Sequence, residues 1–262
     1  MRIALGVEYD GSRFSGWQSQ TGQRTVQSSL EEALARIACH PVATVCAGRT
    51  DAGVHAHGQV VHFDTEAERP DAGWVRGVNS HLPPDLSVSW VRQAVPDPFH
   101  ARFSALRRTY RYVIFNRPVR PATLHGRVSW FYKPLDAERM QQAAQALLGE
   151  HDFTSYRAAY CQAKSPCRRV EQIQVVRHGL FVIIAITANA FLHHMVRNIA
   201  GVLTMIGEGE RPVEWAGEVL AARDRAQGGI TAPPHGLYLE RVEYPEAFAI
   251  PYLDLPRNGL IW

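Results

Sequence analysis

The sequence predicts an α+β fold in which two ferredoxin-like β-α-β-β-α-β units share a mixed, mostly antiparallel sheet. Three observations support this prediction. Strand-like alternation and helix-like periodicity follow one another along the chain, the order of elements in the first half recurs in the second, and no low-complexity linker separates the halves. We therefore predict an N-terminal unit at residues 1–104, which carries a catalytic loop, and a C-terminal unit with insertions at residues 105–262.

The first half supplies one complete β-α-β-β-α-β series. Thr25 can cap a helix whose apolar residues recur with a period of 3.6, and Pro41 would end it. Leu86, Val88 and Trp90 alternate with serines, as in a half-buried strand. The elements expected in chain order are a strand at 3–9, the helix at 26–40, strands at 42–49 and 59–63, a helix at 71–79 and a strand at 86–90.

The second half repeats the series. Asp136 can cap a helix that Gly149 would end, and His178-Gly179 suits a hairpin turn. The strongly apolar segment at 191–206 predicts a helix ending at Gly207, and Pro212 would open another. The elements expected in order are a strand at 108–115, the helix at 136–148, hairpin strands at 169–176 and 180–188, the two helices and a strand at 237–244.

Composition excludes several classes of protein. The hydrophobic fraction of 46% and the charged fraction of 20% are those of an ordinary folded chain. No apolar run reaches the roughly 18 residues that cross a bilayer, and the N-terminus does not resemble a secretory signal. The four cysteines form no Cys-x-x-Cys pair, so free or buried thiols are expected. Together these features predict a cytoplasmic protein without a membrane segment.

The basic residues are unevenly distributed, although the net charge is only +3. Residues 98–135 and 153–170 contain no acid, and aromatic residues are interspersed among their bases. Guanidinium groups suit phosphates and rings suit bases, so these stretches favour an RNA-binding surface. An arginine-rich solvated face with the aromatics in the core is the alternative. The bases are Arg102, Arg107, Arg108, Arg111, Arg117, Arg120, Arg127, Lys133, Arg157, Lys164, Arg168 and Arg169.

The segment Gly48-Arg49-Thr50-Asp51-Ala52-Gly53-Val54-His55 is the strongest candidate for chemistry. Small residues leave room around the Asp51 carboxylate, and glycines permit a tight turn and close approach by a ligand. A carboxylate in this position can serve as a nucleophile or a general base. Taken alone, an aspartate between glycines is more often a simple turn residue.

Together with five further segments, this string resembles the tRNA pseudouridine synthase A family. The likeness runs in the family's order through residues 8–18, 24–27, 48–55, 99–112, 189–197 and 231–239. The resemblance implies the pseudouridine synthase fold and an enzyme that isomerises uridine to pseudouridine at positions 38, 39 and 40 of the tRNA anticodon stem-loop. It also implies a homodimer and a reaction without cofactor or metal.

The resemblance further implies roles for four residues. Asp51 matches the catalytic aspartate, and Arg197 matches the basic residue that pairs with it. Tyr110 matches the tyrosine that packs on the target uracil, and Arg49 the arginine that holds the target base out of the stack. From the residues alone, core packing is the simpler role for Tyr110, because a strand places it on one face with Tyr112.

Arg197 lies in an apolar helix on a narrow polar stripe with Asn189, His193 and Thr204. A guanidinium in that setting needs a partner if it is buried, and Asp51 would satisfy it.

Other chemical signals are weak. His55, His57 and His62 lie close in sequence but bring no further metal ligand, and the phosphate-binding glycine motifs are missing. Two other classes of function stay open. One is an RNA-binding module without activity, and the other is a hydrolase with Asp51 as its nucleophile.

Overall fold

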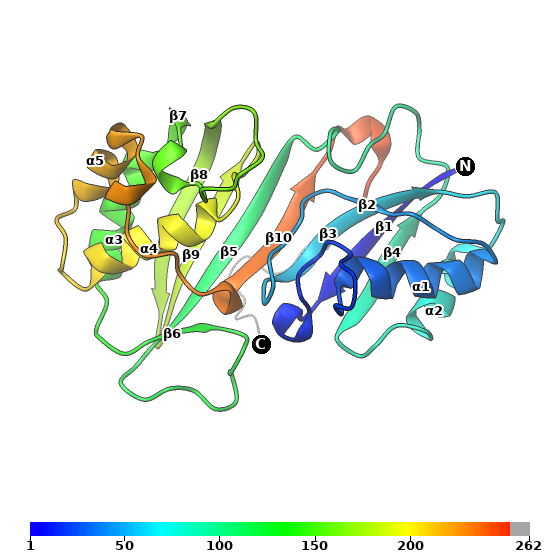
Figure 1. Ribbon diagram of the computed structural model, residues 1–262, viewed down its shortest axis with the longest axis horizontal. Helices are drawn as coiled ribbons and strands as arrows, with labels where there is room; N and C mark the ends of the chain where they lie inside the picture. Colours follow the sequence, from blue (N-terminus) through cyan, green and yellow to red (C-terminus); the bar gives the residue numbers. More distant parts are fainter. Residues whose placement is uncertain (252–262) are drawn as a thin grey trace.

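The computed structural model describes residues 1–251, so residues 252–262 of the predicted second unit lie outside it. Within this range one mixed sheet runs in the order β4-β1-β3-β10-β5-β9-β8-β7, with β2 beside β3 and β6 beside β5 (Figure 1). The strands are β1 Arg2–Tyr9, β2 Val45–Cys46, β3 His55–Asp64, β4 Leu86–Arg92, β5 Arg107–Asn116, β6 Ser129–Phe131, β7 Gly149–Asp152, β8 Cys167–His178, β9 Phe181–Ala188 and β10 Leu237–Glu243. The helices are α1 Val26–Ala38, α2 Asp71–Asn79, α3 Ala137–Ala144, α4 Met195–Gly207 and α5 Trp215–Ala222.

The strand order confirms the predicted fold class. In the first half, β4 lies beside β1, β1 beside β3 and β3 beside β2. The second half repeats this arrangement as β10-β5-β9-β8, with β6 and β7 as additions. Both series have the ferredoxin-like order, in which the last strand of the unit lies next to the first. The domain boundary after residue 104 stays a prediction, because the sheet is continuous across it.

The two halves meet at a short parallel pairing between β3 and β10. Tyr238 lies opposite His55, and Leu239 lies opposite Ala56. Apart from this pairing and that of β5 with β6, neighbouring strands are antiparallel. Helix α1 covers the first half of the sheet and α4 the second, as Figure 1 shows. The main core lies between the sheet and the helices, and its buried residues come from both halves.

Local sequence explains most element boundaries. The Thr25 hydroxyl accepts a hydrogen bond from the Ser28 amide at the start of α1, and Asp136 caps α3 in the same way. Helix α2 has the predicted bounds, and β8 and β9 turn back on each other at His178 and Gly179. The starts of α1 and α3 and the β8–β9 hairpin were predicted correctly because a polar cap or a turn residue marks each of them.

The strand predicted at 42–49 is wrong over most of its length, since only Val45–Cys46 pairs as a strand. Hydrogen bonds to side chains take the place of the missing hydrogen bonds between strands. Glu31 accepts hydrogen bonds from both the amide and the hydroxyl of Thr44. The Gln59 amide group donates to the Gly48 carbonyl at 2.7 Å. Because the backbone bonds to side chains, the residues after Cys46 can leave the sheet.

The helix predicted at 191–206 also starts too early, because α4 begins at Met195. His194 has the left-handed backbone angles φ 62° and ψ 4°, which a right-handed helix cannot contain. The apolar residues Phe191 and Leu192 imitate a helical period but belong to the turn before the helix. The polar stripe predicted along this helix is therefore wrong for Asn189 and His193.

Three smaller differences concern the second half. Helix α3 ends at Ala144 and passes into a 3-10 turn before Gly149, which begins the unpredicted strand β7. Helix α5 begins at Trp215, after a turn that Pro212 opens. No helix among the described residues is long and apolar enough to cross a membrane. All four cysteines are free, as the sequence predicted.

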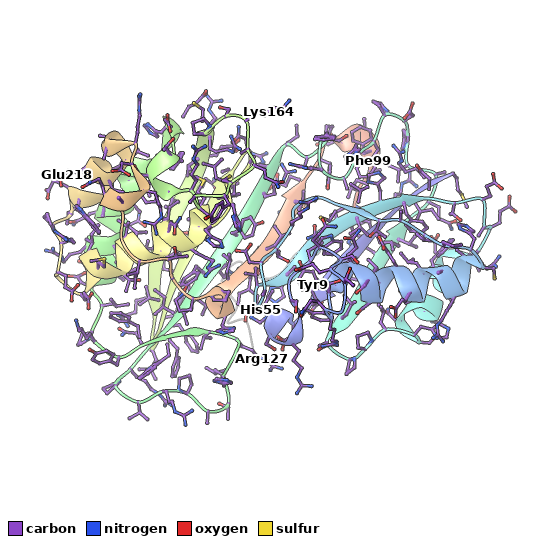
Figure 2. All side chains as sticks on the ribbon, in the orientation of Figure 1. Tyr9, His55, Phe99, Arg127, Lys164 and Glu218 are labelled. Atoms are coloured by element: carbon purple, nitrogen blue, oxygen red, sulfur yellow. The ribbon has the colours of Figure 1, made fainter. Side chains whose placement is uncertain are left out.

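Two buried histidines make the stability of this fold depend on pH. His55, which Figure 2 labels near the junction of the halves, is only 2% exposed, and burial lowers its pKa to about 4. Its Nδ1 accepts from the Gly11 amide, and its Nε2 lies 3.1 Å from the His235 carbonyl. Burial also lowers the pKa of His62 to about 4.

We therefore expect the free energy of unfolding to fall as the pH drops from 6.5 toward 4. A histidine in the unfolded chain has a pKa of about 6.5, so it becomes protonated at a pH where the buried histidine of the folded chain is still neutral. The unfolded chain therefore binds more protons, and acid favours unfolding. His55 alone should contribute a loss of about 2 kcal/mol between pH 7.5 and pH 5. Urea unfolding across this range measures it. His55→Gln should flatten the dependence, whereas His178→Gln, at an exposed position, should not. A stability that is constant from pH 7.5 to 5 would contradict this account.

Candidate active site

The loop between β2 and β3 carries Asp51, and neighbouring segments fix it in place. The Thr50 carbonyl accepts a hydrogen bond from the Trp17 amide at 2.9 Å, and the Thr50 hydroxyl lies 2.8 Å from the Tyr9 hydroxyl. Both anchors are buried. Thr50 therefore holds the backbone immediately before Asp51 against the first strand and the loop that follows it.

Glycines make this packing possible. Gly16 has a φ of +89°, and a Cβ at that position would lie 2.8 Å from the Thr50 carbonyl oxygen. Gly53 has a φ of +78° within a turn that the Val54 amide closes on the Asp51 carbonyl at 3.1 Å. The turn predicted around Asp51 is therefore present, and an L side chain at either glycine would strain it.

Three cationic or titratable groups surround the Asp51 carboxylate. Arg197 Nη1 donates to Asp51 Oδ2 at 3.1 Å. His193 Nε2 lies 3.2 Å from Asp51 Oδ1, and His194 Nε2 lies 3.2 Å from Asp51 Oδ2. The Asp51 side chain is nevertheless 28% exposed, so a ligand can reach it. The site thus combines an accessible carboxylate with compensation for its charge.

Arg197 is fixed from its other side by the segment that precedes β10. Its side chain is 14% exposed, and its Nε donates to the Ala232 carbonyl at 2.8 Å. The Ala232 amide in turn donates to the Arg197 carbonyl at 3.1 Å. The guanidinium therefore bridges a backbone carbonyl and the Asp51 carboxylate. The structure brings together the two residues that the sequence analysis paired.

The two histidines were not predicted as site residues. His193 was assigned only to the polar stripe, and nothing in the sequence connects His194 with Asp51. The one available signal was their position four and three residues before Arg197, which was already assigned to the site. Burial lowers the pKa of His194, the Arg197 charge adds to this, and the Asp51 carboxylate opposes it. His194 is therefore uncharged at neutral pH.

The three histidines that lie close in sequence, His55, His57 and His62, do not converge on a common site. His55 faces the His235 carbonyl, and His57 Nδ1 lies 2.6 Å from Glu240 Oε1. His62 accepts from the backbone amide of Ala101. Among residues 1–251, three potential metal ligands converge instead at Asp51, His193 and His194.

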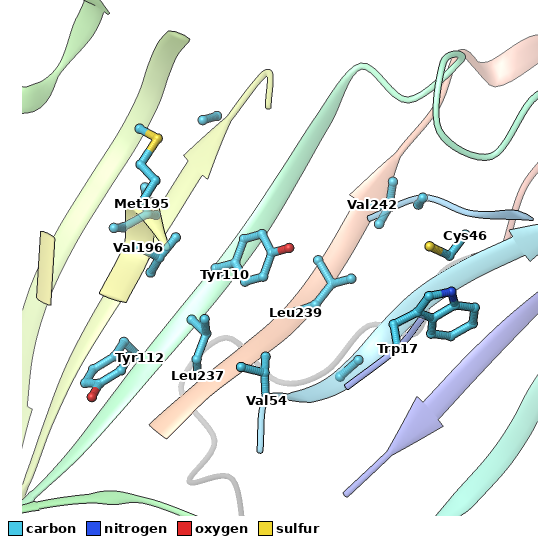
Figure 3. Close-up of a cluster of buried hydrophobic side chains, with 14 of the residues drawn as sticks. Trp17, Cys46, Val54, Tyr110, Tyr112, Met195, Val196, Leu237, Leu239 and Val242 are labelled. Carbon is cyan, nitrogen blue, oxygen red and sulfur yellow. The ribbon is translucent and has the colours of Figure 1, made fainter. Parts of the chain in front are cut away.

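Tyr110 forms part of the floor beside Asp51. Its ring is 8% exposed and meets Phe191 edge-on, with the ring centroids 4.9 Å apart. Burial raises the pKa of its phenol, and the Asp51 charge adds to the rise. Figure 3 shows Tyr110 on β5 with Leu239 of β10 on one side and Val196 of α4 on the other. Tyr110 is thus a core residue that also borders the site.

Arg49 lies apart from this cluster. Its side chain is exposed, although it precedes Asp51 by only two residues. Within residues 1–251 it forms no hydrogen bond or ion pair with the protein. The structure thus leaves Arg49 on the surface beside the site, with its guanidinium available to a ligand.

Arg108 has a structural role that the sequence did not indicate. It is buried, and its guanidinium donates to the carbonyls of Ala47, Arg102, Ala105 and Asn189. These carbonyls belong to the segments before the Asp51 loop, before β5 and after β9. Arg108 therefore ties together three loops around the site and is not a phosphate ligand.

Comparison with known proteins identifies the family. The model of a tRNA pseudouridine synthase family matches residues 6–104 and 143–245, which is more than half of the chain. A tRNA pseudouridine synthase A of Pseudomonas aeruginosa is 60% identical over 251 residues, covering 95% of this chain and 88% of the relative. One of Nitrosococcus oceani is 59% identical over 256 residues, covering 98% of each chain.

The chain belongs to the tRNA pseudouridine synthase family. Members of this family are isomerases, so the resemblance seen in the sequence is confirmed. Asp51, Arg49 and Arg197 lie within the segments that match the family model, whereas Tyr110 falls between them. A solved structure titled "Crystal Structure of a Cbf5-Nop10-Gar1 Complex" matches with a TM-score of 0.35 and 11% identity, over 90% of this chain and 57% of that one.

The contact between Arg197 and Asp51 should be measurable as an energetic coupling. Arg197→Met should reduce the free energy of unfolding by about 2 to 3 kcal/mol, because it leaves a half-buried carboxylate and the Ala232 carbonyl without their donor. In thermal and urea melts, the double variant with Asp51→Asn should lose less than the sum of the single changes, by about 1 kcal/mol or more.

Arg107→Met is the matched control, because Arg107 is 43% exposed and its ion pairs with Glu171 and Glu243 lie at the surface, so the change should cost no more than about 1 kcal/mol. If the double variant lost as much free energy of unfolding as Arg197→Met and Asp51→Asn together, the Arg197–Asp51 contact would contribute no coupling.

Proposed function

We propose that this chain converts uridine to pseudouridine at positions 38, 39 and 40 of the tRNA anticodon stem-loop, with Asp51 as the nucleophile. The observation that carries the proposal is an accessible carboxylate, charge-compensated by Arg197, in a chain about 60% identical to a tRNA pseudouridine synthase A. The positions and the residue roles follow from the resemblance described for the sequence.

The reaction requires few protein groups besides this carboxylate. Uracil must be detached from its ribose, turned and rejoined through C5, so the C5 proton is released to water, N1 gains a proton, and no electrons are exchanged with an outside reagent. Asp51 can attack the sugar C1′, attack the uracil ring or assist a glycal route. In each of these routes Arg197 compensates the charge of the carboxylate and holds it in position.

The target base must first leave its stack, at a cost of about a few kcal/mol. Tyr110 offers a ring at the floor of the site, and Phe191 holds that ring in place. Arg49 is exposed beside Asp51 and can hold the displaced nucleotide or its phosphate. Stacking and a guanidinium contact are the interactions that offset the cost of flipping a base.

The RNA surface that we propose is smaller than the basic stretches suggested. Arg107 is paired with Glu171 and Glu243, Arg108 is buried, and Arg111 faces Glu240. These arginines contact other groups of the protein, and Arg108 and Arg111 do not form the solvated face that the alternative interpretation expected. They cannot all contribute to RNA binding.

The exposed bases Arg102, Lys164 and Arg169 and the exposed rings of Phe103 and Tyr160 remain available. Their loops are tied to the site by hydrogen bonds from Arg108 to the Arg102 carbonyl and from the Ala158 amide to the His193 carbonyl. In Figure 2, Lys164 and Phe99 both lie in the upper part of the view, in loops beyond the ends of the strands.

We further propose a cytoplasmic homodimer that holds one tRNA across both subunits. The two rival functions fit the site less well. A glycosidase uses a pair of carboxylates, whereas the groups around Asp51 are a guanidinium and two imidazoles. A module that only binds RNA would have no need of an accessible carboxylate held by a guanidinium and two imidazoles.

Asp51→Asn should abolish turnover while leaving tRNA binding nearly intact, because it removes the nucleophile but changes the surface little. The expected loss is about 10³-fold or more, which corresponds to roughly 4 kcal/mol in the activation barrier. Release of tritium from tRNA labelled at uracil C5 measures turnover, and filter binding measures affinity.

Asp64→Asn is the control, because that carboxylate lies on the surface in a pair with Arg2 and should not affect turnover. Near-normal activity in Asp51→Asn would remove Asp51 from the mechanism. Normal tRNA binding by a wild-type protein that releases no tritium would favour the binding module.

Transcripts with cytidine at all three positions should release no tritium, whereas restoring a single uridine at 38, 39 or 40 should restore release. Affinity for the transcript should fall steeply as salt rises, since several phosphate contacts release counterions. Light scattering during the same assays should show the mass of a dimer. Release from the all-cytidine transcript would contradict the site preference, and an active monomer would contradict the dimer.

A further inference from the structure

His193 and His194 present two imidazoles to the same carboxylate, although they are consecutive in sequence. Their ring centroids lie 4.0 Å apart, with an angle of 41° between the planes. The ligand atoms of Asp51, His193 and His194 all lie within 4.8 Å of one another. Three donors of this kind at such short range constitute a possible metal site.

The backbone is arranged to produce this geometry. His194 adopts φ 62°, an uncommon conformation for a residue other than glycine. This turn places the His194 ring alongside that of its predecessor. The surrounding bonds hold the turn, because the His193 carbonyl accepts from the Ala158 amide at 2.9 Å and the His194 carbonyl accepts from the Asn198 amide at 2.9 Å. Strained backbone of this kind is typical of functional sites.

The donor spacing suits a tetrahedral ion. Zinc bonded at about 2.0–2.1 Å holds its ligands about 3.3–3.4 Å apart. His193 Nε2 lies 3.2 Å from Asp51 Oδ1, whereas His194 Nε2 lies 3.2 Å from the other oxygen, Oδ2, so an ion on Oδ1 requires the His194 ring to rotate toward that oxygen. The third separation, between the imidazoles, can be at most 4.8 Å and would shorten by a rotation of the rings. The exposed fractions of 45% for His193 and 27% for His194 leave space for that rotation.

The ligand set favours one class of ion. Imidazole binds zinc and similar late transition metals, whereas magnesium and calcium prefer an all-oxygen shell. Arg197 stays on Asp51 Oδ2, which leaves one carboxylate oxygen and two imidazoles as the available donors. Asp51 Oδ1 has no guanidinium contact and faces His193, so it is the oxygen that a metal would use.

We propose that Asp51, His193 and His194 form a binding site for a divalent ion of the zinc class, and that the bound ion inhibits the enzyme by occupying Asp51. The metal takes no part in catalysis. The binding itself is independent of the proposed function, whereas the inhibition rests on the role of Asp51 as nucleophile. Zinc and the target uridine then compete for one carboxylate.

The test is a zinc titration of the full chain, without an affinity tag, against a chromophoric chelator at pH 7.5. Wild-type protein should bind one equivalent at this site. His193→Gln, His194→Gln and Asp51→Asn should each weaken that binding by about 10- to 100-fold or more. His178→Gln, which changes an exposed histidine far from the site, should bind as the wild type does. X-ray absorption of the zinc-bound protein should show two imidazoles.

A second measurement follows tritium release as zinc is added and then removed with a chelating agent. Inhibition should be reversible and should require at least tenfold more zinc in His194→Gln. Magnesium should not inhibit. Absence of a bound equivalent, or equal zinc binding in the wild type and all three site variants, would overturn the proposal. Binding without any tritium release from metal-free protein would instead count against the proposed function alone.

Discussion

The short parallel pairing between β3 and β10 places the two halves of the site opposite each other. β3 begins at His55, directly after the turn that carries Asp51, and β10 begins soon after Ala232, which holds Arg197. Because His55 lies opposite Tyr238, the register of this pairing sets the carboxylate and the guanidinium at one level of the sheet. A shift of one residue would turn every side chain of β10 to the other face and move the segment of Ala232, which binds Arg197, relative to the Asp51 turn.

The loops around Asp51 are held mainly by hydrogen bonds in which no acidic side chain takes part. Arg108 is compensated by four carbonyl dipoles, and burial lowers its pKa as expected for a cation without a carboxylate partner. Thr50 is fixed by an amide and a hydroxyl. The loops around Asp51 are therefore held largely by groups other than its carboxylate, whose side chain stays 28% exposed to a ligand.

The sequence predicted what local patterns encode and failed where distant residues override them. Capped helices such as α1 and the β8–β9 hairpin could be placed because Thr25 and Gly179 mark their ends. The start of α4 could not, because the left-handed turn at His194 is maintained by bonds to residues far along the chain. The pairing of Asp51 with Arg197 was available only through family resemblance. The convergence of His193 and His194 on Asp51 had only the weak signal of their position shortly before Arg197, since contact between them depends on the sheet register.

The two carboxylate oxygens of Asp51 differ in how easily a ligand can reach them. Oδ2 contacts Arg197, whose side chain is 14% exposed, while Oδ1 faces His193, whose side chain is 45% exposed. An approaching ligand can displace the exposed imidazole far more easily than the half-buried guanidinium, which would have to give up the Ala232 carbonyl as well. The more accessible oxygen is therefore Oδ1, which His193 covers, whereas His194 lies on Oδ2 beside Arg197. An ion held as proposed by Oδ1 and the histidines would occupy the side from which a ligand reaches the Asp51 carboxylate.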